Sequence, residues 1–279
     1  MAEAVQRINA GWPYWRNCRD VVTVMRALAA QKDYSKTGVE LGPITFEADV
    51  DALLRKPNAK YIDAEIAWYM SGDRSVHGLV AQYGKLPIVW KEVAGPDGRV
   101  ASQYGIRVFG RRSDGTSRRA PETFPSQYDR VLSELTANPD SRRAIFMYAG
   151  RGTMFERGEY GGDDQLCTIS VQLLRSKDDG LIYHVHMRSN DAVYGYANDA
   201  AWHHYLITRH LLWDLPLCFR MEPPRIIWTA GALTVYPRHV HLLHDDPEAD
   251  GPAWPYGENF GKPWDWTMQW DEHDGYKGA

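Results

Sequence analysis

Apolar residues recur every three to four positions in four stretches of the chain, and this spacing predicts amphipathic helices. The stretches are residues 19–31, 63–71, 126–137 and 199–213. Gly72 should end the second helix and Asn138-Pro139 the third, because glycine and proline interrupt helical hydrogen bonding. Three helices are therefore expected before residue 140, and the longest one in the C-terminal half.

Shorter apolar runs predict strands at residues 143–148, 166–174, 181–188 and 225–229, and one strand within a loop at 37–49. Turn-forming residues at 177–180 would join the strands on either side of them into a hairpin. Glycine, proline and charged residues predict a turn at 95–98 and loops at 110–123, 150–164 and from 245 onward. Helices at both ends of a run of strands predict an α+β protein, and residues 1–279 are expected to form a single domain.

Composition narrows the classes of function. With 44% hydrophobic and 24% charged residues, the 279-residue chain is neither disordered nor collagen-like. The net charge of −4 argues against a nucleic-acid partner, although a few arginines could hold a small anion. The three cysteines are widely spaced, and no apolar run suits a signal peptide or a membrane span. We therefore expect a cytoplasmic protein with no membrane partner.

Cys167 is the first candidate for chemistry. It opens a predicted strand after a glycine-rich acidic loop, and Arg188 ends the next strand of the hairpin. A guanidinium near a thiol lowers the thiol's pKa and favours the nucleophilic thiolate. The alternative is that Cys167 is a small buried apolar residue, as lone cysteines often are.

Two segments could bind a phosphate. Residues 188–191 (RSND) combine a guanidinium, a hydroxyl and backbone amides at a strand end, and Arg142 and Arg143 stand at the start of another strand. Each segment has a plain alternative. The first could be a surface turn held by local hydrogen bonds, and the arginine pair could be two solvated charges.

Two acidic residues allow two interpretations each. Glu65 lies in an apolar helix and is either solvent-facing or a buried acid with a raised pKa. Asp199 is either the N-cap of the long helix or part of a site.

His184 and His186 alternate along a strand without a third ligand at a supporting spacing, so no metal site is expected. The dinucleotide, P-loop and α/β-hydrolase motifs are absent from the sequence.

Several segments, in order along the chain, resemble motifs of the thymidylate synthase family. Residues 65–73 (EIAWYMSGD) are similar to its E-L-x-W-F-L-x-G-D helix, and residues 139–143 (PDSRR) to its P-x-S-R-R segment. Cys167 and Gln172 have the spacing of its P-C-H-x-x-x-Q strand, and residues 188–199 (RSNDAVYGYAND) resemble R-S-x-D-x-x-L-G-x-P-F-N. Residues 104–107 and 228–236 also match family motifs. The resemblance implies a large mixed β-sheet flanked by helices.

Three positions depart from the family pattern, and one of these departures indicates a subgroup of the family. Asp199 replaces the family's asparagine, as in the subgroup of cytidylate hydroxymethylases. Thr168 replaces the histidine after the cysteine, and Thr234 replaces a histidine that contacts the sugar in the family. The arginine of the family's N-terminal phosphate loop has no clear counterpart here, and Lys36 is a candidate for it.

The resemblance also implies roles for single residues. It implies a homodimer that binds a pyrimidine nucleoside monophosphate and 5,10-methylenetetrahydrofolate as co-substrate, without a metal. Cys167 would attack C6 of the base, Glu65 would organise the attacking water, and Tyr104 would assist proton removal at C5. The residues implied to contact the nucleotide are Arg142 and Arg143 from across the dimer, Arg188, Ser189, Gln172 and Tyr236. Those implied to contact the folate are Asp191 and Trp90.

Asp199 would select the base. Uracil presents an N3–H donor and an O4 acceptor, whereas cytosine presents an N3 acceptor and an N4 amino donor. A carboxylate accepts from N4, and a protonated carboxyl also donates to N3. We therefore expect C5-hydroxymethylation of CMP or dCMP. The alternatives are a thymidylate synthase, a dUMP hydroxymethylase, or a nucleotide-binding protein that has lost catalysis. The sequence does not distinguish a ribose from a deoxyribose in the nucleotide. It also does not distinguish phage DNA modification from antibiotic biosynthesis as the biological setting.

Overall fold

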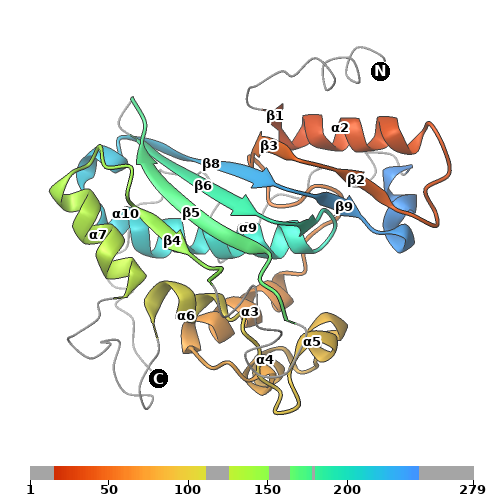
Figure 1. Cartoon of the computed structure of the whole chain (residues 1–279), viewed down its shortest axis with the longest axis horizontal. Helices are drawn as coiled ribbons and strands as arrows, with labels where there is room; N and C mark the ends of the chain where they lie inside the picture. The colour runs from red at the N-terminus through yellow and green to blue at the C-terminus, as the bar shows by residue number, and fades with distance from the viewer. Residues whose placement is uncertain (1–15, 111–125, 151–163, 178–179, 245–279) are drawn as a thin grey trace.

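The centre of the fold is a six-stranded mixed sheet with the strand order β1-β3-β8-β6-β5-β4 (Figure 1). The computed structural model describes residues 16–110, 126–150, 164–177 and 180–244. The strands of this sheet are β1 (Arg16–Asn17), β3 (Ile44–Glu47), β4 (Ile145–Met147), β5 (Thr168–Arg175), β6 (Gly180–Met187) and β8 (Glu222–Ala230). Because β6 pairs parallel with β8 and antiparallel with β5, the mixed sheet and the predicted hairpin are both confirmed.

A second, three-stranded sheet has the order β2-β9-β7. Its strands are β2 (Val39–Leu41), β9 (Leu233–Val235) and β7 (Asn190–Asp191). The sequence predicted one strand within residues 37–49, but two form there, β2 and β3, separated by Gly42-Pro43. In the small sheet Asp191 pairs with Thr234, so the segment that follows β6 lies beside the segment that follows β8.

The helices include the four that were predicted, and two of them, α3 (Ala59–Ser71) and α9 (Gly195–Leu206), begin four residues earlier than predicted. The other two are α2 (Cys18–Ala29) and α7 (Gln127–Ala137). Helix α9 continues through a π-helical turn (Ile207–Leu211) into α10 (Leu212–Asp214). No helix in the described ranges is long and apolar enough to cross a membrane.

Between residues 72 and 110 the sequence predicted only a turn, and the structure has three short helices there as well. These are α4 (Val76–Tyr83), α5 (Ile88–Val93) and α6 (Tyr104–Phe109). The predicted turn is present, with the Gly98 N–H donating to the Gly95 carbonyl at 2.9 Å. Short 3-10 turns follow α10 and β9, at Leu217–Phe219 and Pro237–Leu243. The predicted loops at 110–123, 150–164 and from 245 onward lie almost entirely outside the described residues.

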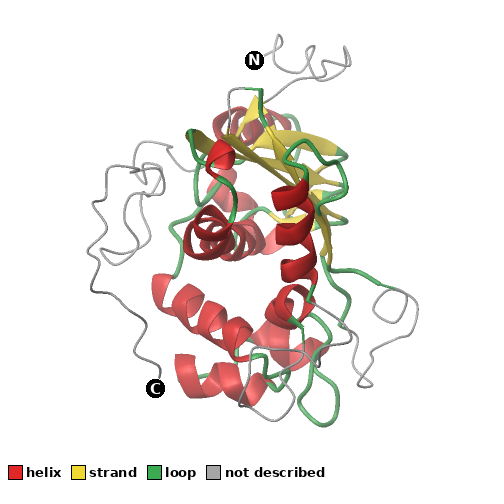
Figure 2. Cartoon of the chain, turned by 90° about the vertical axis from the view of Figure 1, so that its left-hand side faces the viewer, coloured by secondary structure: helices red, strands yellow, loops and turns green. Residues whose placement is uncertain are grey.

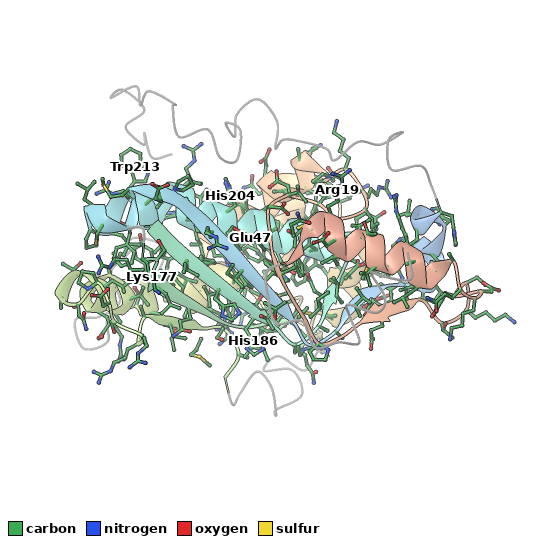
Figure 3. The ribbon with its side chains drawn as sticks, turned by 90° about the horizontal axis from the view of Figure 1, so that it is seen from above. Arg19, Glu47, Lys177, His186, His204 and Trp213 are labelled. Carbon is green, nitrogen blue, oxygen red and sulfur yellow. The ribbon has the colours of Figure 1, made fainter. Side chains whose placement is uncertain are left out.

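The two faces of the large sheet differ in character. The face toward α9 carries fully buried side chains, among them Phe46, Phe146, Tyr183, Val185 and Trp228. The residues that alternate with these are exposed or partly exposed, among them Thr45, Met147, Gln172, His186 and Thr229. Figure 2 shows the strands in the upper part of the view with helices beside and below them, and Figure 3 places His186 on the side away from α9. No helix of the described part of the chain covers that face (Figure 1).

Helix α6 approaches α3 closely, and this contact positions Tyr104. A Cβ atom on Gly105 would lie 1.8 Å from the carbonyl oxygen of Tyr69, so a larger residue would force the helices apart. The Gln103 amide donates to the carbonyls of both Trp68 and Tyr69 at 2.9 Å and so fastens the start of α6 to the end of α3. Tyr104 consequently stacks on Tyr69, with ring centroids 5.2 Å apart.

Candidate active site

Three of the predicted site residues meet although they come from distant parts of the chain. Cys167 immediately precedes β5, Asp199 lies one turn inside α9, and Glu65 lies on α3. The charge of Asp199 raises the pKa of Cys167, and the charge of Glu65 raises the pKa of Asp199. The three groups therefore lie close enough to influence one another's protonation.

Cys167 is partly buried beside Arg188 and Ser189. Its Sγ atom lies 3.8 Å from an Arg188 guanidinium nitrogen and 3.9 Å from the Ser189 hydroxyl. Arg188 lowers the thiol pKa, as the sequence predicted, but burial is the larger cause and Asp199 adds to it, so the pKa is raised. The prediction that Arg188 lowers the thiol pKa of Cys167 overall is thus wrong for the nucleotide-free chain. Neutralising Asp199 would remove one of the two leading causes of the rise.

Arg188 holds the segment that ends at Cys167. Its Nε atom donates to the Leu166 carbonyl at 2.9 Å, and one terminal nitrogen donates to the Gln165 carbonyl at 2.9 Å. The other terminal nitrogen donates to the Ser189 hydroxyl at 3.0 Å. These contacts make Arg188 a positioning residue for the thiol. Its contact with a phosphate stays a prediction.

Glu65 is buried, so the solvent-facing interpretation is wrong. It is 5% exposed, and burial raises the pKa of its carboxyl to about 7. The Tyr61 hydroxyl donates to Glu65 Oε1, and the Trp90 indole N–H donates to the Tyr61 oxygen at 2.7 Å. Tyr61 was not among the predicted site residues, although a spacing of four residues on one helix places it on the same face as Glu65.

Asp199 is not a helix cap. Helix α9 begins at Gly195 with Tyr194 as its N-cap, so Asp199 lies inside the first turns and the N-cap interpretation is wrong. The Asn190 side-chain amide donates to Asp199 Oδ2 at 2.8 Å. Burial, followed by the charge of Glu65, raises the pKa of Asp199 to about 8. The carboxyl group is therefore mostly protonated at neutral pH.

The predicted phosphate residues Arg142 and Arg143 are both exposed and precede β4, an edge strand of the large sheet. The Gln172 side-chain amide donates to the main-chain carbonyl of Arg142 at 2.9 Å. Gln172 and Cys167 are five positions apart along β5, which corresponds to about 16 Å of extended chain. The arginine turn thus lies at a distance along the sheet from the thiol of its own chain.

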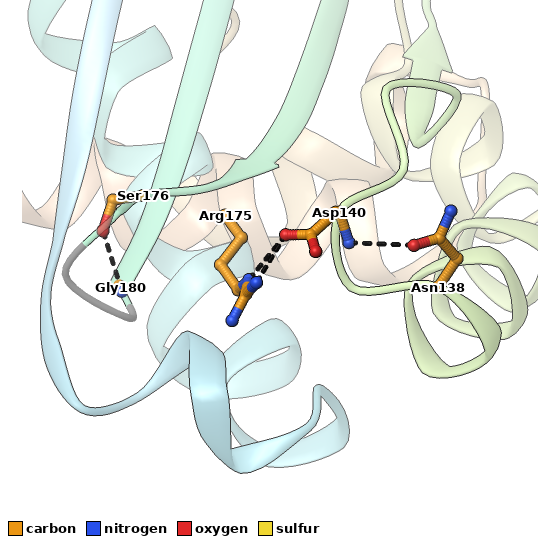
Figure 4. A network of polar contacts seen from close by, with 5 residues as sticks. All are labelled: Asn138, Asp140, Arg175, Ser176 and Gly180. Carbon is orange, nitrogen blue, oxygen red and sulfur yellow. Dashed lines mark hydrogen bonds and ion pairs between the residues drawn. The ribbon is translucent and has the colours of Figure 1, made fainter.

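A network of polar contacts fixes this arginine turn (Figure 4). The Arg175 guanidinium donates twice to Asp140 Oδ1, at 2.9 and 2.6 Å, and the Asp140 N–H donates to the side-chain oxygen of Asn138 at 3.1 Å. The ion pair links the end of β5 to the turn before β4. It leaves the side chains of Arg142 and Arg143 exposed.

Asp191 and Tyr236 lie close to Cys167. The charges of Asp191 and Cys167 raise the pKa of Tyr236, after partial burial, so the three side chains share one site. Tyr236 is 43% exposed and Asp191 is partly exposed. Both Asp191 oxygens accept backbone N–H bonds from the turn that precedes α9, at 3.0 and 3.3 Å. No group of three metal-binding side chains occurs within the described segments.

A family model of thymidylate synthase matches residues 45–249, which is more than half of the chain. The chain belongs to the thymidylate synthase family. Its relatives include the deoxycytidylate 5-hydroxymethyltransferases of Enterobacteria phage T4, 35% identical over 222 residues, and of phage T6, 36% identical over 225 residues. Each match covers 76% of this chain and 83% of the relative.

A solved member of the family has the same fold. The thermostable thymidylate synthase A from Bacillus subtilis superposes with a TM-score of 0.51 and 19% identity, over 75% of this chain and 71% of its own. The superposition supports the thymidylate synthase-like fold that the motifs predicted.

Where the sequence departs from the thymidylate synthase pattern, the structure shows neutral replacements. Thr168, in place of the family's histidine, is fully buried and donates a hydrogen bond to the Tyr104 hydroxyl at 3.0 Å. Burial and the charge of Asp199 raise the pKa of Tyr104 well above its ordinary value, so its hydroxyl keeps its proton. Thr234, in place of the other histidine, donates to the Glu40 carboxylate at 3.3 Å.

No sequence pattern indicated a role for Asn190. It occupies the variable position of the family's R-S-x-D motif, so the resemblance assigns it no role. The structure nevertheless makes it the hydrogen-bond partner of Asp199.

Proposed function

We propose that this protein is a deoxycytidylate 5-hydroxymethyltransferase. It converts dCMP, 5,10-methylenetetrahydrofolate and water into 5-hydroxymethyl-dCMP and tetrahydrofolate. The observation that carries this proposal is the Asp199 carboxyl, which stands at the position of the family's asparagine and is held largely in its protonated form. Such a group can donate to cytosine N3 and accept from N4 at the same time. The phage relatives, named for deoxycytidylate, favour the deoxynucleotide.

Cys167 is the proposed nucleophile. Its Sγ atom forms a bond to C6 of the base, which makes C5 nucleophilic, and C5 then bonds to the carbon of the one-carbon unit. The folate, when bound, supplies that carbon at the oxidation level of formaldehyde. Loss of the C5 proton and of tetrahydrofolate leaves an exocyclic methylene group on the nucleotide. Water adds to this carbon, the C6–S bond breaks, and Cys167 is regenerated.

Glu65 is the proposed acid–base group for the added water. Its pKa of about 7 means that both protonation states are populated at neutral pH, which suits a group that must accept and return a proton. Tyr61 and Trp90 hold the carboxyl in place through two successive hydrogen bonds. Tyr104, which keeps its proton, would donate a hydrogen bond within the network that assists proton removal at C5.

The residues proposed to contact the folate are chemically suited to it. Asp191 is partly exposed, and its oxygens retain lone pairs beyond those that accept the two backbone bonds. Trp90 uses its N–H for Tyr61, so the face of its ring is the part that would contact a planar heterocycle.

We also propose that the working enzyme is a homodimer. The sheet face opposite α9 is free of helices in the described part of the chain, and Ile145 and Met147 on its edge strand are 37% and 49% exposed. A second copy packed on this face would cover them and would bring the partner's copies of Arg142 and Arg143 toward a neighbouring site. The cytoplasmic setting predicted from the sequence is retained as part of this proposal.

The test is product analysis. Purified protein is incubated with methylenetetrahydrofolate and dCMP, CMP or dUMP in parallel, and the nucleotides are identified by mass spectrometry. The expected product is 5-hydroxymethyl-dCMP, with CMP and dUMP turned over much more slowly and the Cys167→Ser variant inactive. A methylated product with release of dihydrofolate would instead identify a thymidylate synthase activity. Absence of turnover with all three nucleotides would refute the proposal.

A further inference from the structure

Asn190 is a buried side chain that is only partly satisfied. It is 4% exposed, and its Nδ2 atom donates to Asp199 Oδ2 at 2.8 Å. Its Oδ1 atom is equally buried and has no hydrogen-bond partner among the described residues. Buried polar atoms without a partner are rare and costly, so this acceptor, next to the base-reading carboxyl, indicates a ligand donor.

The surrounding backbone holds the Asn190 amide in place. Its backbone N–H donates to the Ala232 carbonyl at 2.8 Å, and β7 pairs with β9 at this point. A Cβ atom on Gly195 would lie 3.3 Å from Asn190 Nδ2, tighter than ordinary van der Waals contact, so the first turn of α9 packs directly on the amide. The side chain is thereby kept against Asp199.

We propose that Asn190 is a specificity-determining residue, which binds the cytosine amino group together with Asp199 and fixes which oxygen of the Asp199 carboxyl bears the proton. This inference rests on the proposed function. Because Oδ2 accepts a hydrogen bond from Asn190, it acts as the carbonyl oxygen of the acid, and the proton resides on Oδ1. Oδ1 then donates to cytosine N3. The N4 amino group has two hydrogens, and the second lone pair of Oδ2 and the free Oδ1 of Asn190 accept one each.

The same arrangement excludes uracil. Uracil O4 would face two acceptors, and uracil N3–H would face the proton on Asp199 Oδ1. Moving that proton to the second lone pair of Oδ2 would make Oδ2 a hydroxyl oxygen, which is a poorer acceptor for the Asn190 N–H, and would still leave Asn190 Oδ1 facing uracil O4, so the change of tautomer is opposed. Asn190 thus supplies the repulsive element that a specific site needs beside its attractive contacts.

The experiment measures nucleotide binding separately from turnover. Asn190→Ala and the near-isosteric Asn190→Leu are made in a Cys167→Ser background, and the Kd values for dCMP and dUMP are determined by calorimetry. We expect the dCMP Kd to rise about ten-fold, the size of one hydrogen bond to a ligand, while the dUMP Kd is unchanged or lower. Asn198→Ala, which removes an amide beside Asp199 in the same helix, is the matched control and should preserve the ratio.

The outcomes separate the two proposals. Equal weakening of dCMP and dUMP in the folded Asn190 variants would mean a merely structural role and would overturn the inference. An unchanged Kd ratio in the variants would overturn it as well. Thermal denaturation identifies which variants are folded, and Asn190→Leu, which keeps the approximate volume of the side chain, provides the measurement if Asn190→Ala does not fold. If the wild-type protein does not hydroxymethylate dCMP, the proposed function fails whatever the Asn190 variants do.

Discussion

Replacing Asp199 with asparagine is expected to shift nucleotide preference from dCMP toward dUMP. The carboxylic acid donates to N3 and accepts from N4 of cytosine, whereas the amide NH₂ would donate to O4 of uracil and its oxygen would accept from N3–H. Asp199 lies inside α9, so the change removes no helix cap. Any effect on the nucleotides can then be assigned to base recognition.

The pH dependence gives this prediction a magnitude. With a pKa of about 8, Asp199 is about nine-tenths protonated at pH 7, and only the protonated form can donate to N3. The dCMP affinity of the Cys167→Ser protein should therefore fall only by about half from pH 7 to 8. Above pH 8 it should fall about ten-fold for each further unit. The asparagine variant has no proton to lose and should show no such slope.

The size of the change in the ratio of dCMP affinity to dUMP affinity can be estimated as well. A buried acceptor left without a partner costs roughly 1–3 kcal/mol, which is about a 5- to 150-fold change in affinity for each nucleotide. Calorimetric titrations of dCMP and dUMP between pH 7 and 9.5, with Cys167→Ser as the common background, would measure both effects. The kcat/KM values of the Cys167-containing proteins would check them under turnover. An unchanged dCMP/dUMP ratio together with an unchanged pH slope would falsify the base-reading role.

The pH dependence of the free energy of unfolding provides an independent test of the raised Asp199 pKa. The native pKa of Asp199 lies above its ordinary value, so the native state binds more protons than the unfolded state between about pH 4 and 8. The stability contributed by the neutral acid is therefore fully present below pH 4 and is lost as pH rises through 8. Relative to the Asp199→Asn protein, the wild type should lose Tm progressively over this range. A constant Tm difference would contradict the raised pKa.

The remaining predictions concern the other groups of the site. Cys167→Ser should abolish turnover and retain dCMP binding, and residual hydroxymethylation would refute the covalent step. An inactive Cys167→Ser chain mixed with an inactive Arg142→Ala/Arg143→Ala chain should regain activity in heterodimers, and failure of verified heterodimers would assign the arginines to their own chain. Glu65→Gln should preserve exchange of the C5 proton better than hydration, and equal loss of both would contradict its assignment to water. Tyr61→Phe removes a hydrogen bond that lowers the Glu65 pKa, so the acidic limb of the kcat profile should move to higher pH; an unmoved limb would show that the bond does not tune the carboxyl.

The sequence predicted the main elements of the fold because their periodic patterns are long. The hairpin β5-β6 and helices α2, α3 and α7 all follow from such patterns, and the family motifs implied the mixed sheet. The three short helices α4, α5 and α6 were missed because helices of six to eight residues are marginal in isolation and depend on tertiary contacts. The Gln103 bonds to the end of α3 are contacts of this kind.

The wrong predictions for the site residues were all made from neighbouring positions in the sequence, which do not show tertiary contacts. Asn198-Asp199 before an apolar stretch is typical of an N-cap, but the carboxylate that bonds the backbone N–H groups ahead of α9 belongs to Asp191. Glu65 could not be placed inside or outside from helical spacing, because spacing does not say which face another helix covers. For Cys167 the predicted neighbour Arg188 was found, yet burial outweighs it in setting the thiol pKa.

These protonation states connect base recognition to activation of the thiol. Asp199 raises the pKa of Cys167 only to the extent that it is ionised, and binding of cytosine N3 to its O–H would hold the carboxyl in the neutral form. At pH 7 about nine-tenths of Asp199 is already neutral, so this effect is small there. Above pH 8 a bound cytosine nucleotide would remove one of the causes that keep Cys167 protonated, and Arg188 would then act on the thiol with less opposition. A uracil nucleotide, which offers N3–H in place of an acceptor, would favour the ionised carboxyl instead and leave the thiol pKa high. The same side chain thus discriminates between the bases twice, once in binding and again in forming the nucleophile.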